Sequence, residues 1–323
     1  MIIRRLTCFD YPKIKKLISY LSNDENDKFE GDISEEPLGF VNAMLPIKFK
    51  FKSESFVLID NDDILGLITI NYTQGNPLKV KITRLIFKEN NYEIGKKLVE
   101  FVFQKIGAKG ASTFVVMVDE SHDELFDLFV NGCGFRQCSS ETLWKIENPS
   151  VQKTSFRWRY AQNSDAKAIS ELFNSELTTI YKPSLLRTEK EFKPPFFAGF
   201  SEEYKNRYVS EECGKILGYF SITTSDNLNF ICDITTNSGY EFEYGDIINK
   251  MLAEIKKRNK IFYPLIKQKK YHKNSERLEN YLKSRNYLPI QTMHILVKDF
   301  YKEVPQEASD WKVFVFEENR VSN

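Results

Sequence analysis

Hydrophobic and polar residues alternate along this chain in a pattern that occurs twice. Residues 62–70 (DDILGLITI) and residues 213–222 (CGKILGYFSI) each begin with a turn signal and continue as an apolar run that carries one glycine. Such segments are typical of a turn and the strand that follows it. In both places a further strand and a turn containing a glycine, Gly95 or Gly245, lead into a long amphipathic helix. A repeat of about 150 residues has the size of a domain, so the sequence predicts two related domains in tandem.

The expected elements follow the same order in both repeats. In the first repeat the pattern predicts strands at 2–6, 55–60, 64–72, 79–87, 113–118 and through 143–146, and helices at 10–21, 92–106 and 122–131. In the second repeat it predicts strands at 156–160, 207–210, 216–223, 229–234, 261–266 and 292–297, and helices at 164–174, 244–258 and 275–285. Strands that first follow one another and then alternate with helices favour a mixed α/β sheet flanked by helices.

The boundary between the repeats is expected where Asn-Pro-Ser (148–150) interrupts the periodicity. We therefore predict an N-terminal domain over 1–148, a C-terminal domain over 154–300 and a tail over 301–323. Alternating apolar residues at 311–316 predict one more strand in this tail, which would complete one of the two sheets.

Composition narrows the class of protein. Hydrophobic residues make up 41% and charged residues 28%, as in globular domains. The net charge of +1 gives no field that selects nucleic acid or a membrane as partner. Five cysteines without a C-x-x-C pair, together with only three histidines, argue against a metal site or a disulfide scaffold. The sequence shows no signal peptide and no membrane span, which predicts a cytoplasmic protein.

Two short motifs suggest a family. Leu85-Ile86-Phe87 lead into the turn 90–96 (NNYEIGK), and Cys133-Gly134-Phe135 close a short helix. In these motifs and in the order of its strands and helices, the chain resembles the GNAT (N-acetyltransferase-like) acyltransferase superfamily. The resemblance implies two tandem GNAT-like domains, acetyl-CoA or another acyl-CoA as donor, and direct acyl transfer to an amine on a small molecule or peptide. Relatives usually end each domain in a hairpin, whereas each repeat here shows a single strand after its last helix.

The resemblance also implies where the donor binds. The matching positions lie at the end of one strand and the start of the next helix: Leu85, Phe87, Asn90, Asn91, Tyr92, Ile94, Gly95 and Lys96. Amides at a helix N-terminus and the helix dipole favour the CoA pyrophosphate. The motif is degenerate, because Glu93 stands where the family has a glycine and the second repeat keeps only Gly245. The first repeat is therefore the better donor binder.

Candidate acid and base residues fall in the second repeat instead. Family members often use a carboxylate on the fourth or fifth strand as base and a tyrosine in the last helix as acid. In the first repeat the acid position is Val130, which has no proton to donate. In the second repeat Asp233 lies on the fourth strand, and Tyr281 is one residue from the acid position. The alternative interpretation, which the sequence favours, is that Asp233 is a structural carboxylate at a strand end, hydrogen-bonded to a turn.

Three functions are consistent with this distribution. The first is a CoA-dependent N-acyltransferase in which the first repeat is the better donor binder. The second is a catalytically inactive scaffold that binds a ligand or protein through its aromatic loops near 37–46 and 192–200. The third is an acyl or aminoacyl transferase that uses another donor.

Overall fold

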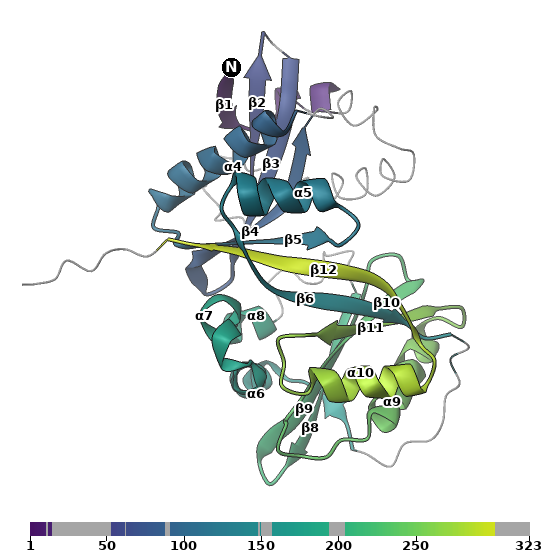
Figure 1. The fold of residues 1–323 in the computed structure, drawn as a ribbon. Helices are drawn as coiled ribbons and strands as arrows, with labels where there is room; N and C mark the ends of the chain where they lie inside the picture. Colours follow the sequence, from purple (N-terminus) through teal and green to yellow (C-terminus); the bar gives the residue numbers. More distant parts are fainter. Residues whose placement is uncertain are drawn as a thin grey trace, which may run out of the picture.

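The computed structural model describes residues 1–10, 12–14, 53–61, 63–87, 91–147, 149, 157–193 and 204–300. We call residues 1–147 the N-terminal unit and residues 157–300 the C-terminal unit. Both units contribute to a single sheet of twelve strands, in the order β1-β2-β3-β4-β5-β12-β6-β11-β10-β9-β8-β7 (Figure 1). The predicted mixed α/β architecture is therefore confirmed.

The N-terminal unit follows the predicted order of elements. Its strands are β1 (Ile2–Arg5), β2 (Ser53–Asp60), β3 (Asp63–Thr73), β4 (Asn76–Phe87), β5 (Thr113–Asp119) and β6 (Arg136–Lys145). Its helical elements are η1 (Cys8–Asp10), α4 (Tyr92–Gly107), α5 (Asp123–Asp127) and the π-helical turn η2 (Leu128–Gly132). Most of the helix expected at 10–21 lies outside the described residues.

The C-terminal unit repeats this order. Its strands are β7 (Arg159–Tyr160), β8 (Tyr204–Glu212), β9 (Lys215–Thr224), β10 (Asn229–Thr236), β11 (Tyr263–Lys269) and β12 (Leu288–Asp299). Its helical elements are η3 (Asn163–Asp165), α6 (Ala166–Glu176), η4 (Thr179–Tyr181), α7 (Lys182–Leu185), α8 (Glu189–Phe192), α9 (Tyr244–Arg258) and α10 (Ser275–Ser284). The stretch between the predicted helix 164–174 and the predicted strand 207–210, for which the pattern predicts no element, contains the short helices η4, α7 and α8.

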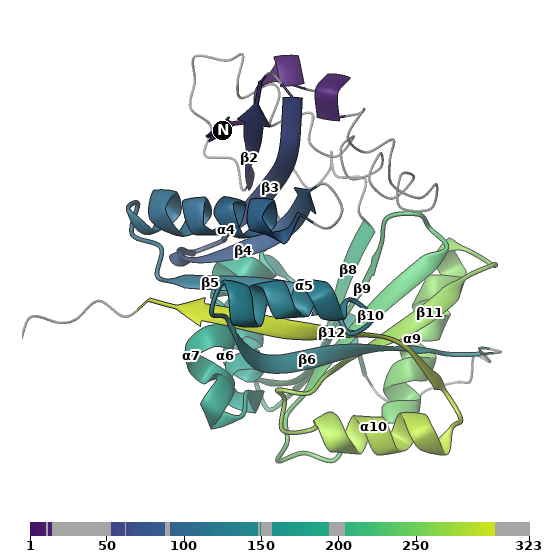
Figure 2. The ribbon, with the colours of Figure 1, turned by 45° about the horizontal axis from the view of Figure 1, so that its top comes forward.

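The two units exchange their last strands. Strand β12 of the C-terminal unit lies between β5 and β6 of the N-terminal unit, and β6 in turn lies between β12 and β11 (Figures 1 and 2). All three of these pairings are antiparallel. The place of the missing hairpin strand in each unit is therefore filled by a strand of the other unit. The predicted strand at 311–316 lies outside the described residues.

Apolar side chains on the strands hold helices on both faces of this sheet. In the N-terminal unit, Val80 and Ile82 of β4 pack in one core with Leu98 and Val102 of α4. In the C-terminal unit, α9 and α10 form a similar core with β10 and β11, while α6 packs in a separate cluster that also contains Tyr219 of β9. The α6–α8 segment extends from this second cluster toward the N-terminal unit.

The α7–α8 segment contacts the N-terminal unit directly. Thr188 Oγ1 donates a hydrogen bond to the Gln74 carbonyl at 2.7 Å, and Arg136 donates one to Ser184 Oγ at 2.6 Å. Gly75 lies under Thr188 with φ +77°, and a Cβ atom there would lie 2.7 Å from Thr188 Oγ1. Glycine is required at this position by both its backbone conformation and the close approach.

Candidate functional site

Strands β4 and β5 separate part of the way along the N-terminal unit. Their parallel pairing ends at Ile82 and Val116. At the same point Thr83 is an extra residue in β4, because Ile82 pairs with Ile70 and Arg84 with Thr69 on β3. A β-bulge of this kind bends its strand and leaves one residue unpaired. Beyond it, residues 83–87 have no partner on β5, so the backbone on that side of β4 borders a gap.

The side chains expected around the donor lie near this gap, and several are packed into the core. Ile94 is only 3% exposed, and Leu85 and Phe87 pack against the N-terminal core. A Cβ atom on Gly95 would lie 2.9 Å from the Phe87 ring and 3.0 Å from Leu128. Gly95 therefore has a packing role, because it lets α4 approach β4 closely. Asn90 lies outside the described residues.

In the first turn of α4, the Ile94 amide donates a hydrogen bond to the Asn91 carbonyl at 2.9 Å. The Asn91 side chain makes no capping hydrogen bond to the helix. Tyr92 stacks edge-on against Phe87, with ring centroids 5.5 Å apart, and its hydroxyl donates a hydrogen bond to Glu124. Lys96 follows in the same turn. This arrangement leaves a helix N-terminus able to receive an anion, although the acidic Glu93 lies in the same turn.

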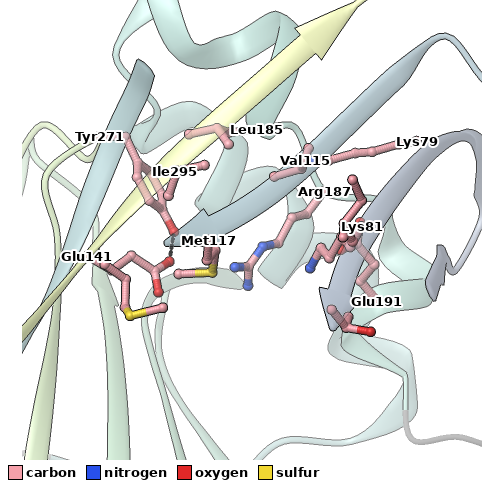
Figure 3. Close-up of a pocket in the computed structure, with 13 residues that line it drawn as sticks. Lys79, Lys81, Val115, Met117, Glu141, Leu185, Arg187, Glu191, Tyr271 and Ile295 are labelled. Carbon is pink, nitrogen blue, oxygen red and sulfur yellow. Dashed lines mark hydrogen bonds between the residues drawn. The ribbon is translucent and has the colours of Figure 1, made fainter. Parts of the chain in front are cut away.

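A pocket of about 300 Å³ opens where β4 and β5 part (Figure 3). The N-terminal unit lines it with Lys79, Lys81, Ile82, Thr83, Val115, Met117 and Glu141. The C-terminal unit lines it with Leu185, Arg187, Glu191, Tyr271, Met293 and Ile295. Because side chains alternate along a strand, Lys79 and Lys81 point away from the face on which Val80 and Ile82 contact α4. The pocket therefore lies on the face of the sheet opposite α4, under the α7–α8 segment.

Three cations gather on one side of this pocket. Figure 3 shows the Arg187 guanidinium and the Lys81 ammonium directed into the cavity next to each other. Burial and the neighbouring Lys81 lower the pKa of Lys79 to about 8, and burial and Arg187 lower the pKa of Lys81. Although burial opposes its charge, the oxygens of Tyr271, Asp233 and Glu141 keep the pKa of Arg187 above its ordinary value.

These cations have few direct partners. The Lys79 ammonium donates to the Leu186 carbonyl at 3.4 Å, and the Arg187 guanidinium lies over the Phe173 ring at 4.4 Å. Among the described residues, the ion pairs include none of Lys79, Lys81 and Arg187. Glu191 also lines the pocket beside them, and its charge favours the charged form of each.

A carboxylate occupies the other end of the pocket. Glu141 of the exchanged strand β6 accepts a hydrogen bond from the Tyr271 hydroxyl at 2.6 Å and pairs with Lys267 at 3.3 Å. Burial disfavours its charge, but Lys267 and Tyr271 outweigh burial and lower the pKa of Glu141. Glu141 is therefore ionised at neutral pH, and Figure 3 shows it facing Arg187 across the cavity.

The equivalent gap in the C-terminal unit is filled by side chains. Pairing of β10 with β11 ends at Asp233 and Lys267. Beyond it, Asn274 donates hydrogen bonds to the Thr236 carbonyl and hydroxyl at 3.0 and 3.1 Å, and the Lys269 ammonium donates to Thr235 at 2.8 Å. A pocket of about 20 Å³ lies beside these residues, on the side of α9 and α10, and it holds about one water molecule.

The candidate acid and base residues lie in this filled region but not together. Asp233 is hydrogen-bonded and ion-paired with Lys269, whose side chain is 2% exposed. Burial would raise the pKa of Asp233, but Lys269, Lys267 and Arg187 lower it strongly. Tyr281 of α10 lies on the other face of the sheet, with its hydroxyl 3.1 Å from where a Cβ atom on Gly245 would be.

Sequence reasoning missed Glu141 and Arg187 because the exchanged strand and the α7–α8 segment carry no motif. Lys79 and Lys81 did have a signal, since two lysines alternate with apolar residues in a strand and so share one face. Cys133 and Cys138 are buried free thiols. Among the described residues, no group of His, Cys, Asp and Glu could hold a metal ion, and no helix could cross a bilayer.

The fold resembles several solved structures. A GCN5-related N-acetyltransferase from Sphaerobacter thermophilus matches with a TM-score of 0.56 and 13% identity, over 92% of this chain and 95% of that one. A tandem GNAT protein from the clavulanic acid biosynthesis pathway matches with a TM-score of 0.51 and 10% identity, over 76% of this chain and 82% of that one.

A third structure gives the same result. A GCN5-related N-acetyltransferase from Anabaena variabilis matches with a TM-score of 0.50 and 13% identity, over 92% of this chain and 72% of that one. Neither a protein-family model nor a curated protein sequence matches the chain. Sequence identities of 10–13% establish similarity of fold and not of function. The chain has the fold of the GNAT acetyltransferases, in two tandem units.

Proposed function

We propose that this protein is an acyl-CoA-dependent N-acyltransferase whose N-terminal unit carries the working site. One observation supports this proposal above the others. The gap between β4 and β5 opens into a pocket of about 300 Å³, whereas a pocket of about 20 Å³ lies near the end of the β10–β11 pairing in the C-terminal unit. Ligand pockets for small molecules begin at about 300 Å³, so the first of these two pockets has the size of a small-molecule site and the second does not.

The donor would enter this gap from the side of α4. The pantetheine arm of CoA is an extended chain with amide groups, and the unpaired backbone of β4 beyond Ile82 could bond to it as another strand would. The pyrophosphate would lie at the first turn of α4, near the Asn91 and Tyr92 amides and the Lys96 ammonium. The thioester would then emerge between Thr83 and Met117, on the floor of the pocket.

The reaction we propose is a direct transfer. The lone pair of the acceptor amine attacks the thioester carbonyl carbon, a C–N bond forms and the C–S bond breaks. The amine loses one proton to solvent or to a pocket base, and the CoA thiolate takes up one proton, which leaves an amide and free CoA. Holding the amine beside the thioester accelerates the transfer by positioning the two reacting groups.

Asp233 and Tyr281 have structural roles in this proposal. A carboxylate with a strongly lowered pKa is a poor proton acceptor, and Asp233 neutralises the buried Lys269. Tyr281 covers Gly245 in the filled gap of the C-terminal unit. The C-terminal unit would thus act as a partner that shapes the site of the N-terminal unit.

The inactive scaffold is the second candidate, and one observation favours it. The Phe87 ring occupies the space beside Gly95, where a donor site would need bare backbone. A scaffold would use the same pocket to hold a ligand without transferring anything to it. The transferase is expected to bind acetyl-CoA, whereas the scaffold is not.

Calorimetric titration with acetyl-CoA tests the proposal. Met117→Trp would fill the gap of the N-terminal unit. Met117 itself is 41% exposed, so the larger side chain can be placed without disturbing the core. Gly245→Trp is the comparison variant in the C-terminal unit, in the first turn of α9. We expect one binding site that is lost in Met117→Trp and kept in Gly245→Trp. Absence of binding to the unmodified protein supports the scaffold, and the reverse variant pattern places the donor in the C-terminal unit.

A further inference from the structure

We propose that the acceptor is an amine that also carries an anionic group, a carboxylate or a phosphate, and that cations from both units bind this group. The inference rests on the proposed function and specifies its acceptor. Lys79 and Lys81 come from β4, whereas Arg187 comes from the segment between α7 and α8. The acceptor site is therefore complete only when the two units are joined.

The first argument is the charge at one end of the pocket. Lys79, Lys81 and Arg187 converge there, and the one carboxylate drawn beside them, Glu191, forms no ion pair with them although its charge favours their charged forms (Figure 3). Burial lowers the pKa of both lysines, and the neighbouring cations lower it further, while Glu191 partly opposes this. An anion would relieve this repulsion, and a guanidinium beside an ammonium suits the oxygens of a carboxylate or phosphate.

The second argument separates this anion from the phosphates of CoA. The cations lie on the face of the sheet opposite α4, because Lys79 and Lys81 alternate with Val80 and Ile82, which contact that helix. The pyrophosphate is proposed to lie at the N-terminus of α4, on the other face. The two anion sites are therefore on opposite sides of the gap, and the thioester between them faces the cation cluster.

The third argument is the carboxylate at the other end. Glu141, held ionised by Tyr271 and Lys267, faces the same cavity. An acceptor with an ammonium and an anionic group could lie between Glu141 and the cations. A cavity of about 300 Å³ is at the lower limit for small-molecule sites, which suits a compact zwitterion.

Three small amines test the proposal without requiring catalysis. β-Alanine carries a carboxylate, phosphoethanolamine carries a phosphate, and ethanolamine carries no anionic group. Thermal unfolding of the full chain is followed with each amine, because a ligand that binds only the folded protein raises its stability. The variants are Arg187→Gln and Lys81→Gln, with Lys215→Gln as the control, since Lys215 is an exposed lysine at the start of β9.

We expect β-alanine or phosphoethanolamine to raise the unfolding temperature while ethanolamine does not. Whichever of the two is effective identifies the anion. The effect should disappear in Arg187→Gln and weaken in Lys81→Gln, and remain in Lys215→Gln. In an assay of CoA thiol release, Arg187→Gln should lower kcat/KM for the anionic acceptor by about 10- to 100-fold and leave that for ethanolamine unchanged.

Equal responses to the three amines, including no response to any, would overturn the proposal. So would an anion effect that persists in Arg187→Gln, or loss of acetyl-CoA binding in that variant, which would assign the cations to the donor. If the unmodified protein does not bind acetyl-CoA, the proposed function fails, but the amine comparison still decides this inference because it needs no donor.

Discussion

Thr142 of β6 and Thr292 of β12 lie opposite each other in the sheet, and their hydroxyl groups are hydrogen-bonded at 3.2 Å. The two residues are 150 positions apart in the chain, as are Gly95 and Gly245. Equivalent positions of the two units therefore meet at the centre of the twelve-stranded sheet. The contact lies between the two exchanged strands, so the pairing of β6 with β12 joins the two units.

Separating the units should prevent either from folding alone. Residues 1–148 would lack β12, and residues 154–323 would lack β6, so each sheet would lose an internal strand and expose unpaired edges. We expect each half alone to aggregate or to lack a cooperative unfolding transition, and the two halves expressed together to form a one-to-one complex. Size-exclusion chromatography and circular dichroism of the halves check this. A monomeric half that unfolds cooperatively would contradict it.

Gly75→Ala should weaken the contact between the units. The substitution places a methyl group 2.7 Å from Thr188 Oγ1 at a φ of +77°. We expect a loss of about 1–3 kcal/mol in the free energy of unfolding, from backbone strain and from displacement of the α7–α8 segment. Urea unfolding measures this loss.

Gly214→Ala is the matched control for that substitution. Gly214 also lies in a hairpin turn with φ +76°, but nothing lies within 4 Å of its added Cβ atom. It should show the strain alone, about 1 kcal/mol, and leave the response to anionic amines intact. Equal losses in the two variants would mean that Thr188 does not hold the segment in place.

Local signals explain why so much of the fold could be predicted. Helix α9 (Tyr244–Arg258) has the predicted bounds, because its apolar periodicity and flanking residues are contained in its own sequence. The exchange of β6 and β12 could not be predicted in the same way. Alternating residues in 288–299 indicate that a strand forms, but they do not specify its neighbour.

The pocket illustrates the same limit. Lys79 and Lys81 could be assigned to one face of β4 from their spacing alone. Arg187 lies between two short helices without a strong periodicity, and its meeting with β4 depends on how the units pack. Asp233 was identified on the correct strand, but its partner Lys269 lies on the next strand, and only the packed sheet shows that this carboxylate is neutralised.

Lys269→Met should be strongly destabilising. It would leave Asp233 in the sheet without the ammonium that neutralises it, and breaking a buried pair in this way costs about 3–5 kcal/mol. The pKa of Asp233 is lowered in the folded protein, so the pair contributes stability above the ordinary value of 3.8 and loses it as the pH falls below that value. The stability difference between the unmodified protein and the variant should therefore shrink below about pH 4.

Chemical unfolding at pH 7 and pH 3.5 tests this difference. The double variant Asp233→Leu, Lys269→Met should recover most of the loss at pH 7, because it removes both charges. It should also retain acetyl-CoA binding if Asp233 has the structural role proposed. A Lys269→Met loss that is the same at both pH values would show that the two side chains do not form a pair in solution.

Lys79→Met should stabilise the protein and weaken anion binding at the same time. Burial and the nearby Lys81 and Arg187 lower the pKa of Lys79 from 10.5 to about 8, while Glu191 and Cys138 partly oppose this. The unfolded chain therefore binds one more proton than the folded chain between about pH 8 and 10.5, so stability rises with pH across this window. Below pH 8 the charged lysine destabilises the fold by up to about 3 kcal/mol.

Removing that charge should raise the free energy of unfolding at pH 7 by about 1–3 kcal/mol and flatten its rise between pH 8 and 10. Lys215→Met, at an exposed position, should change neither quantity. Urea unfolding at pH 7, 8, 9 and 10 provides the comparison. If Lys79→Met is less stable than the unmodified protein at pH 7, the lysine has a compensating partner and the cluster is structural. A more stable variant that no longer responds to anionic amines would show that this charge serves ligand binding at the expense of the fold.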